Sequence, residues 1–198
     1  MSREHRSGLI VCSLVSLLLV GFYSGGSAIF QTMDFDRQLI TQGQWWRIFS
    51  GSWVHFTLWH LLMNVAVLMV IGAVLGESVP MRWWVSVIML ASWGVGAGLW
   101  WMEPSCSLYA GFSGVVQAVL VFALISSLRH APVGTRLVLG CVVLRIVYEH
   151  TAFYNPDYLR NWIHVAVQPA AHAFGAFTGA VVGLIYELQV RHRSSSLP

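Results

Sequence analysis

Residues 83–102 read WWVSVIMLASWGVGAGLWWM and contain no Asp, Glu, Lys, Arg or His. Two tryptophans stand at each end of this stretch, Trp83-Trp84 and Trp100-Trp101. An α-helix rises about 1.5 Å per residue, so a helix of this length crosses the roughly 30 Å hydrocarbon layer of a bilayer. Because tryptophan is enriched at both membrane interfaces, the stretch predicts a transmembrane helix with an aromatic belt at either end.

The composition of the whole chain agrees with a membrane protein. Of its 198 residues, 57% are hydrophobic and 10% are charged, against about a quarter charged in ordinary soluble domains. The 11 basic residues are all arginines, and the formal net charge is only +3. Such sparse charge predicts no nucleic-acid partner and is typical of membrane topology signals. The three cysteines have no C-x-x-C or zinc spacing, and we expect neither a metal nor a cofactor.

Working outward from 83–102, the chain contains five further apolar segments. We therefore predict an all-α membrane protein with six transmembrane helices, at 8–29, 57–76, 83–102, 107–128, 135–150 and 165–187. They form one domain over 8–188, between cytoplasmic tails at 1–7 and 189–198, and we expect no regular structure from Arg191 onward. The fifth segment is interrupted by Arg145 and Glu149, whose i, i+4 spacing puts opposite charges on one helix face and lowers the cost of burial.

Arginine placement predicts the orientation in the membrane. If the N-terminus is inside, the outer side holds only Arg37, Arg47 and Arg160, and most other arginines fall in inner loops and tails. The positive-inside rule then places both termini in the cytoplasm. A cleaved signal peptide ending near Gly26-Ser27-Ala28 is the alternative for the first segment, although five further spans favour a retained helix.

Three polar residues converge in this topology. The second, fourth and sixth helices all run from outside to inside, and they carry Asn64, Ser113 and His172. At about 1.5 Å per residue, each residue lies roughly 9–14 Å below the outer end of its segment. Polar side chains inside spans are costly and are by default candidates for a functional site. We therefore expect the three to meet in one layer below the outer surface.

Small residues stand beside these polar groups. They are Gly111 and Gly114 on the fourth segment, and Gly175, Gly179 and Gly183 on the sixth. Glycines at four-residue spacing let two membrane helices approach closely, which would bring a His172 imidazole within hydrogen-bond reach of a Ser113 hydroxyl. An adjacent base that takes its proton turns serine into a nucleophile.

Donors for a developing oxyanion are also available. The Asn64 amide and the backbone N–H of Ser113 are candidates, and His60 stands one turn from Asn64 on the same helix face. We expect no carboxylate at the depth of His172, so the sequence predicts a Ser–His dyad rather than a triad.

Other readings of the same residues remain open. Glycine stripes often serve packing alone, an intramembrane serine often bonds its own helix, and His55, His60, His164 and His172 could suggest a metal site without the carboxylates or cysteines that would strengthen it. A transporter or proton relay predicts polar residues through to the inner side, whereas 65–76 and 119–128 are almost wholly apolar. A catalytically inactive membrane protein that binds clients is the other alternative.

At this point the sequence resembles the rhomboid intramembrane serine proteases. The family's H-x-x-x-N, G-x-S-G and A-H-x-x-G-x-x-x-G patterns match 60–64, 111–114 and 171–179, in order, on the second, fourth and sixth helices. Trp46-Arg47 is similar to the family's W-R pair. The resemblance implies Ser113 as nucleophile, His172 as general base and acid, and His60 with Asn64 at the oxyanion site. It also implies six helices around a water-filled cavity open to the outside, and transmembrane protein substrates cut near their outer ends.

One position departs from that pattern. Many rhomboids place an aromatic residue four positions after the serine, beneath the histidine, and here that position is Gln117. The small size, the absence of extra domains and the segment 145–149 are similar to rhombosortases, a bacterial branch thought to process exported proteins whose tails carry a Gly-rich motif, an apolar helix and a basic end. The resemblance then implies a bacterial inner-membrane enzyme whose site opens to the periplasm.

Overall fold

The computed structural model describes residues 7–75, 79–129 and 132–195, and these are mostly helical. Within them, six helices of 15 residues or more form a bundle: α1 (Ser7–Ser24), α5 (Leu58–Val74), α6 (Met81–Met102), α7 (Ser113–Ser127), α8 (Pro132–Glu149) and α10 (Pro169–Ser195). The predicted all-α membrane bundle is confirmed, and the six helices fall on the six expected segments. Arg3 and Arg6, two of the arginines that the predicted orientation places on the inner side, lie outside the described residues.

Several helix boundaries differ from the prediction. The fourth helix begins at Ser113 rather than near 107, and the sixth begins at Pro169 rather than 165. Proline suits the first position of a helix, because the N–H that it lacks has no partner there. The sixth helix also continues to Ser195, so the expectation of irregular chain from Arg191 is wrong for the part that the structure describes.

Not every helix is long enough to cross a bilayer alone. Among the described residues, α1, α6 and α10 are sufficiently long and apolar. The segment Arg47–Trp53 and α5 pass the same test only together, as a pair bent by 86°. Helix α7 is apolar but short, because the chain before it pairs as a strand and turns at Gly111, whose φ is +137°. Ser113 therefore begins a helix rather than lying two turns inside one.

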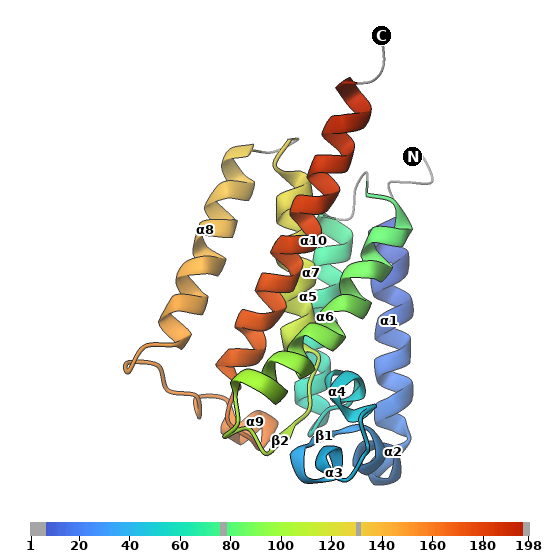
Figure 1. Ribbon diagram of the computed structural model, residues 1–198, viewed down its shortest axis with the longest axis vertical. Coiled ribbons are helices and arrows are strands. Elements are labelled where there is room, and N and C mark those ends of the chain that lie inside the picture. The colour runs from blue at the N-terminus through green and yellow to red at the C-terminus, as the bar shows by residue number, and fades with distance from the viewer. Residues whose placement is uncertain (1–6, 76–78, 130–131, 196–198) are drawn as a thin grey trace.

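A layer of short elements closes one end of the bundle (Figure 1). It comprises α2 (Gly26–Met33), β1 (Phe35–Asp36), α3 (Arg37–Thr41), α4 (Arg47–Ser50), the 3-10 helix η2 (Gly51–Trp53), β2 (Leu108–Tyr109) and α9 (Arg160–Ile163). Strands β1 and β2 pair antiparallel, with Phe35 opposite Tyr109 and Asp36 opposite Leu108. The start of α1 and the end of α10 lie at the opposite end of the bundle in Figure 1.

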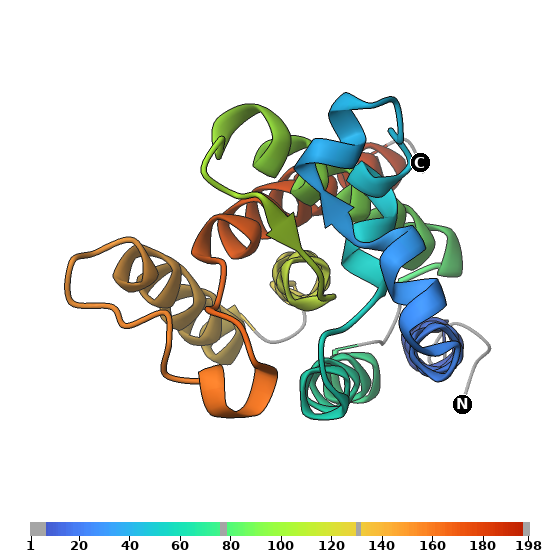
Figure 2. The same ribbon diagram turned by 90° about the horizontal axis from the view of Figure 1, so that it is seen from below.

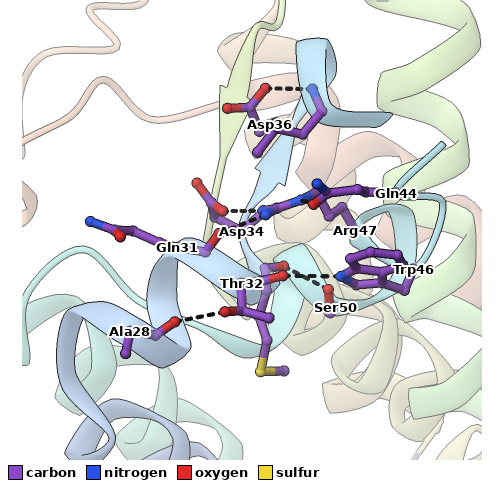
Figure 3. Close-up of polar contacts among 11 residues, drawn as sticks. Ala28, Gln31, Thr32, Asp34, Asp36, Gln44, Trp46, Arg47 and Ser50 are labelled. Carbon is purple, nitrogen blue, oxygen red and sulfur yellow. Dashed lines mark hydrogen bonds and ion pairs between the residues drawn. The ribbon is translucent and has the colours of Figure 1, made fainter. Parts of the chain in front are cut away.

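A buried arginine holds this layer together (Figure 3). The guanidinium of Arg47 pairs with the Asp34 carboxylate and donates to the carbonyls of Asp34 at 2.8 Å and Gln31 at 2.6 Å. It also donates to Oε1 of Gln44 at 2.7 Å. A buried charge is tolerated only when it is paired and hydrogen-bonded, and this network meets that condition by joining α2 to α4.

Helix α7 is the central helix of the bundle (Figure 2). It packs on α10, α6, α8 and α5, and most of its residues are buried. A helix that is apolar all round is the kind that a bundle buries on every side. Helix α1 packs against α5, with Cys12 and Leu19 fully buried, so the first segment is part of the core.

In contrast to the central α7, helix α8 lies at the periphery of the bundle, against α7 and α10.

Candidate active site

The turn before α7 fixes Ser113 at the start of that helix. The N–H of Gly111 donates to the Gly51 carbonyl at 3.2 Å, and the Tyr109 hydroxyl donates to the Gly111 carbonyl at 2.7 Å. The N–H of Phe112 donates to Nε2 of His55 at 3.3 Å. As the first residue of α7, Ser113 carries one of the backbone N–H groups that have no partner within a helix.

The two residues predicted to react with each other are in contact. Nε2 of His172, on α10, lies 3.1 Å from Oγ of Ser113. Both residues are within the first turn of their helices, which start at the same end of the bundle. The predicted meeting of hydroxyl and imidazole is therefore present in the structure.

Glycines permit this contact. A Cβ atom on Gly175 would lie 1.8 Å from the backbone oxygen of Gly114, and one on Gly179 would lie 2.2 Å from that of Ala118. A Cβ on Gly114 would lie 2.7 Å from the Ala171 oxygen. The backbones of α7 and α10 thus touch along the predicted glycine face, which sets the separation of Ser113 and His172.

A third side chain, which the predicted dyad does not include, reaches the imidazole. Oε2 of Glu149 lies 2.7 Å from Nδ1 of His172, and Oε1 accepts from Nε of Arg145 at 3.0 Å. Glu149 is buried, with 4% of its surface exposed. The expectation that no carboxylate lies at the depth of His172 is therefore wrong.

The reason for this error is the helix start. A sixth helix that began near 165 would place His172 deep within it, whereas α10 begins at Pro169 and His172 lies in its first turn. Glu149 is the last residue of α8, at the same end of the bundle. The signal that could have found it was the Arg145–Glu149 pair, which was interpreted only as a way to lower the cost of burial.

The other two predicted site residues line the same cavity. It has a volume of about 530 Å³, and its walls include His60, Asn64, Ser113, Gln117, Arg145 and His172. Helix α5 begins at Leu58, where Oγ1 of Thr57 accepts from the His60 N–H at 3.1 Å. Nδ2 of Asn64 donates to the His60 carbonyl at 2.9 Å. Both side chains are buried, and the cavity brings these residues of α5 together with Ser113 of α7 and His172 of α10.

The His60 ring is held by its neighbours. It stacks on Phe56, with an interplanar angle of 3°, and meets the His55 ring edge-on at 5.0 Å between centroids. Gly111 lies close to the same ring, where an added Cβ would lie 2.5 Å from Cε1 of His60. The absent side chain at Gly111 therefore makes room for this ring beside the serine.

In the described ranges, no three His, Cys, Asp or Glu side chains gather in a way that could hold a metal ion. The chemistry of the cavity is that of a hydroxyl next to an imidazole, with a carboxylate behind the imidazole and amide donors nearby. Such a set suits acyl transfer, in which a serine attacks a carbonyl and polar N–H groups stabilise the resulting oxyanion.

Comparison with known proteins gives concordant results. Residues 42–188 match the family model of the rhomboid domain. The chain is 23% identical to rhomboid protease GlpG of Klebsiella pneumoniae, over 94% of this chain and 64% of that protein. It is 20% identical to rhomboid protease GlpG of Salmonella choleraesuis over the same shares. The chain thus spans a little under two thirds of the length of these curated relatives.

Proposed function

This chain belongs to the rhomboid family, and on that basis we propose that it is a serine endopeptidase that cleaves peptide bonds within the membrane. The observation that carries the proposal is the 3.1 Å approach of Ser113 Oγ to His172 Nε2 inside a cavity of about 530 Å³. The two relatives described above bear the name protease.

Each step of peptide cleavage has a residue to perform it. Ser113 Oγ attacks the scissile carbonyl carbon while His172 Nε2 takes the hydroxyl proton. His172 then returns that proton to the leaving amide nitrogen as the C–N bond breaks. Water attacks the acyl-serine, and His172 accepts a proton from it and passes one back to Ser113 Oγ. No metal or cofactor is required for this sequence.

The oxyanion formed in each half-reaction needs donors in place beforehand. We assign this role to the Ser113 backbone N–H with the side chains of His60 and Asn64, all at the same cavity. The N-terminus of α7 adds the positive end of a helix dipole, which favours negative charge at this point.

The preferred substrate class is the tail of an exported protein, with a Gly-rich motif, an apolar helix and a basic end. Glycine costs a helix about 1 kcal/mol relative to alanine, so a Gly-rich stretch unwinds more easily and can extend into the cavity. A basic end stays on the cytoplasmic side. In the matching orientation, the chain lies in a bacterial inner membrane with both termini in the cytoplasm. Its cavity then opens to the periplasm.

The test is release of a reporter in bacterial cells. A periplasmic reporter domain carries such a tail, and cells express either the wild-type chain or Ser113→Ala. We expect the wild type to release the reporter into the periplasmic fraction and Ser113→Ala to leave it in the membrane. A tail with its Gly-rich motif replaced by alanines should be cut at least about tenfold more slowly, because each substitution favours the uncut helix.

The other outcomes separate the remaining candidates. Equal release by wild type and Ser113→Ala contradicts the protease and favours a protein that only binds clients. Serine-dependent cleavage of both tails at the same rate supports the proposed protease activity and contradicts the proposed preference for a Gly-rich motif. Serine-dependent cleavage at the cytoplasmic end of the tail, located by mass spectrometry of the released product, contradicts the orientation.

A further inference from the structure

We propose that Glu149 is a positioning residue that completes a Ser113–His172–Glu149 relay, and that Arg145 holds its carboxylate in place. This inference rests on the proposed protease function and adds to it the means by which the imidazole is oriented. The Ser–His dyad expected from the sequence would leave the Nδ1 side of the ring without a charged partner. In the structure a carboxylate lies 2.7 Å from that nitrogen.

The contacts of the ring fix its tautomer. An ionised carboxylate can only accept hydrogen bonds, so the Nδ1–H of His172 donates to Oε2 of Glu149. A neutral imidazole then carries a lone pair on Nε2, and the Ser113 hydroxyl donates to that atom across 3.1 Å. This is the protonation state that a general base needs. When the ring takes the serine proton, the carboxylate stabilises the imidazolium.

The charge balance around Glu149 supports an ionised carboxylate. Its side chain is 1% exposed, and a buried charge is costly unless it is paired. Arg145, one turn earlier on α8, donates to Oε1 at 3.0 Å, and its own side chain is 57% exposed. The other titratable groups nearby include His60 on α5, Tyr148 on α8, and Tyr154 and Tyr158 in the loop after α8. Burial raises the pKa of Tyr154, so this phenol adds no negative charge to the site.

The relay also accounts for Gln117. The family resemblance places an aromatic residue there to pack beneath the histidine, and this chain has none at that position. Here the histidine is supported from another direction, by the last residue of the peripheral helix α8. The Glu149–His172 bond therefore joins α8 to α10 at the level of the reacting atoms.

A second cavity lies behind the carboxylate and gives a small anion access to it. It has a volume of about 430 Å³, and its lining includes Arg145, Glu149 and Tyr154. Arg145 lines both this cavity and the larger one that holds Ser113. If the Glu149 side chain is removed, a formate ion can occupy its place beside the same guanidinium.

The experiment measures steady-state cleavage of a tail peptide by the purified full chain in detergent. Glu149→Gln keeps the size of the side chain but removes its charge, and its amide can force the wrong tautomer. We expect kcat to fall at least about 100-fold, with KM within threefold and the thermal unfolding temperature little changed. Loss of the buried aspartate of a comparable triad costs about 10⁴ in kcat.

Glu187→Gln is the matched control, since it also removes a buried carboxylate paired with an arginine. Glu187 is on α10 near the other end of the helix, and its Oε2 accepts from Nε of Arg129 at 2.7 Å. This variant should keep the wild-type kcat. The second variant is Glu149→Ala, whose kcat should rise with added formate at least tenfold, whereas formate should not affect Glu187→Gln.

The outcomes distinguish this inference from the proposed function. If Ser113→Ala abolishes cleavage while Glu149→Gln retains a kcat within threefold of wild type, the protease stands and the relay is contradicted. Failure of both Glu149 variants to fold, or no formate response in a folded Glu149→Ala, also contradicts the relay, because Glu149 would then be a structural residue. If Ser113→Ala cleaves as well as wild type, the proposed function itself fails.

Discussion

At the scale of single residues, Gly111 shows how the backbone prepares the site. Its φ of +137° belongs to a region that side-chain-bearing residues rarely adopt, and a Cβ there would lie 2.5 Å from Cε1 and 2.7 Å from Nε2 of His60. Two constraints therefore require glycine at position 111: the backbone conformation, and the close contact with His60, a candidate donor to the oxyanion. They can be separated experimentally.

We predict that Gly111→Ala lowers both stability and activity. The unfavourable backbone conformation should cost about 1–3 kcal/mol, and the displaced His60 ring should lower kcat at least about tenfold through weaker oxyanion stabilisation. Thermal unfolding and cleavage kinetics provide the two measurements.

The matched control is Gly43→Ala. Gly43 also has a positive φ, +100°, but nothing lies within 4 Å of an added Cβ. The Gly43→Ala variant should lose about as much stability as Gly111→Ala and keep the wild-type kcat. Equal losses of kcat in the two variants would show that contact with His60 has no part in the effect.

The residues that the sequence predicted and the one that it missed differ in a physical way. The end of the bundle at which Ser113, His172 and Asn64 meet could be predicted from the order and direction of their helices, although α7 starts at Ser113 and α10 at Pro169, so the first two lie nearer their helix ends than counting predicted. Glu149 required knowing where two helices end. The Pro169 start of α10 and the end of α8 at Glu149 itself decide that contact, and hydropathy does not mark such ends to within a turn.

At the scale of elements, the close pair of α7 and α10 sets the geometry of the reaction. The backbone oxygens of Gly114 and Ala118 occupy the space where side chains on Gly175 and Gly179 would be. The sequence could predict this face, since its glycines recur every four residues. It could not predict that α7 is only 15 residues long, because the apolar run continues through the strand and turn before it.

Gly175→Ala should force the two helices apart. The added Cβ would lie 1.8 Å from a backbone oxygen, which cannot rotate away as a side chain can. Overpacking of this kind costs about 1–3 kcal/mol, and a shift of about 1 Å between reacting groups can lower the rate by about 100-fold. We expect both losses, measured by thermal unfolding and by kcat/KM.

Gly140→Ala, on α8, is the control for that substitution. Nothing lies within 4 Å of its added Cβ, and alanine favours a helix interior by about 0.5–1 kcal/mol over glycine. Its activity should be unchanged and its stability equal or higher. If Gly175→Ala behaved in the same way, close contact of α7 and α10 could not be what holds Ser113 and His172 together.

At the scale of the whole molecule, the fold is a helical membrane bundle closed at one end by a layer of short elements. Hydropathy was sufficient to predict the six helices and the membrane. It could not predict the bend of 86° between Arg47–Trp53 and α5, nor the Arg47 network of Figure 3, because both depend on hydrogen bonds between segments. That layer and the bundle together bring three helix ends, from α7, α8 and α10, to one place.

The central claim is that Ser113 is a nucleophile activated by His172 within the folded chain. The most direct measurement is labelling with a fluorophosphonate probe, with the modified peptide located by mass spectrometry. We predict one adduct, on Ser113, that is absent in Ser113→Ala and forms at least about 100-fold more slowly in His172→Ala. Labelling that persists in Ser113→Ala, or that proceeds at the wild-type rate without His172, would contradict it.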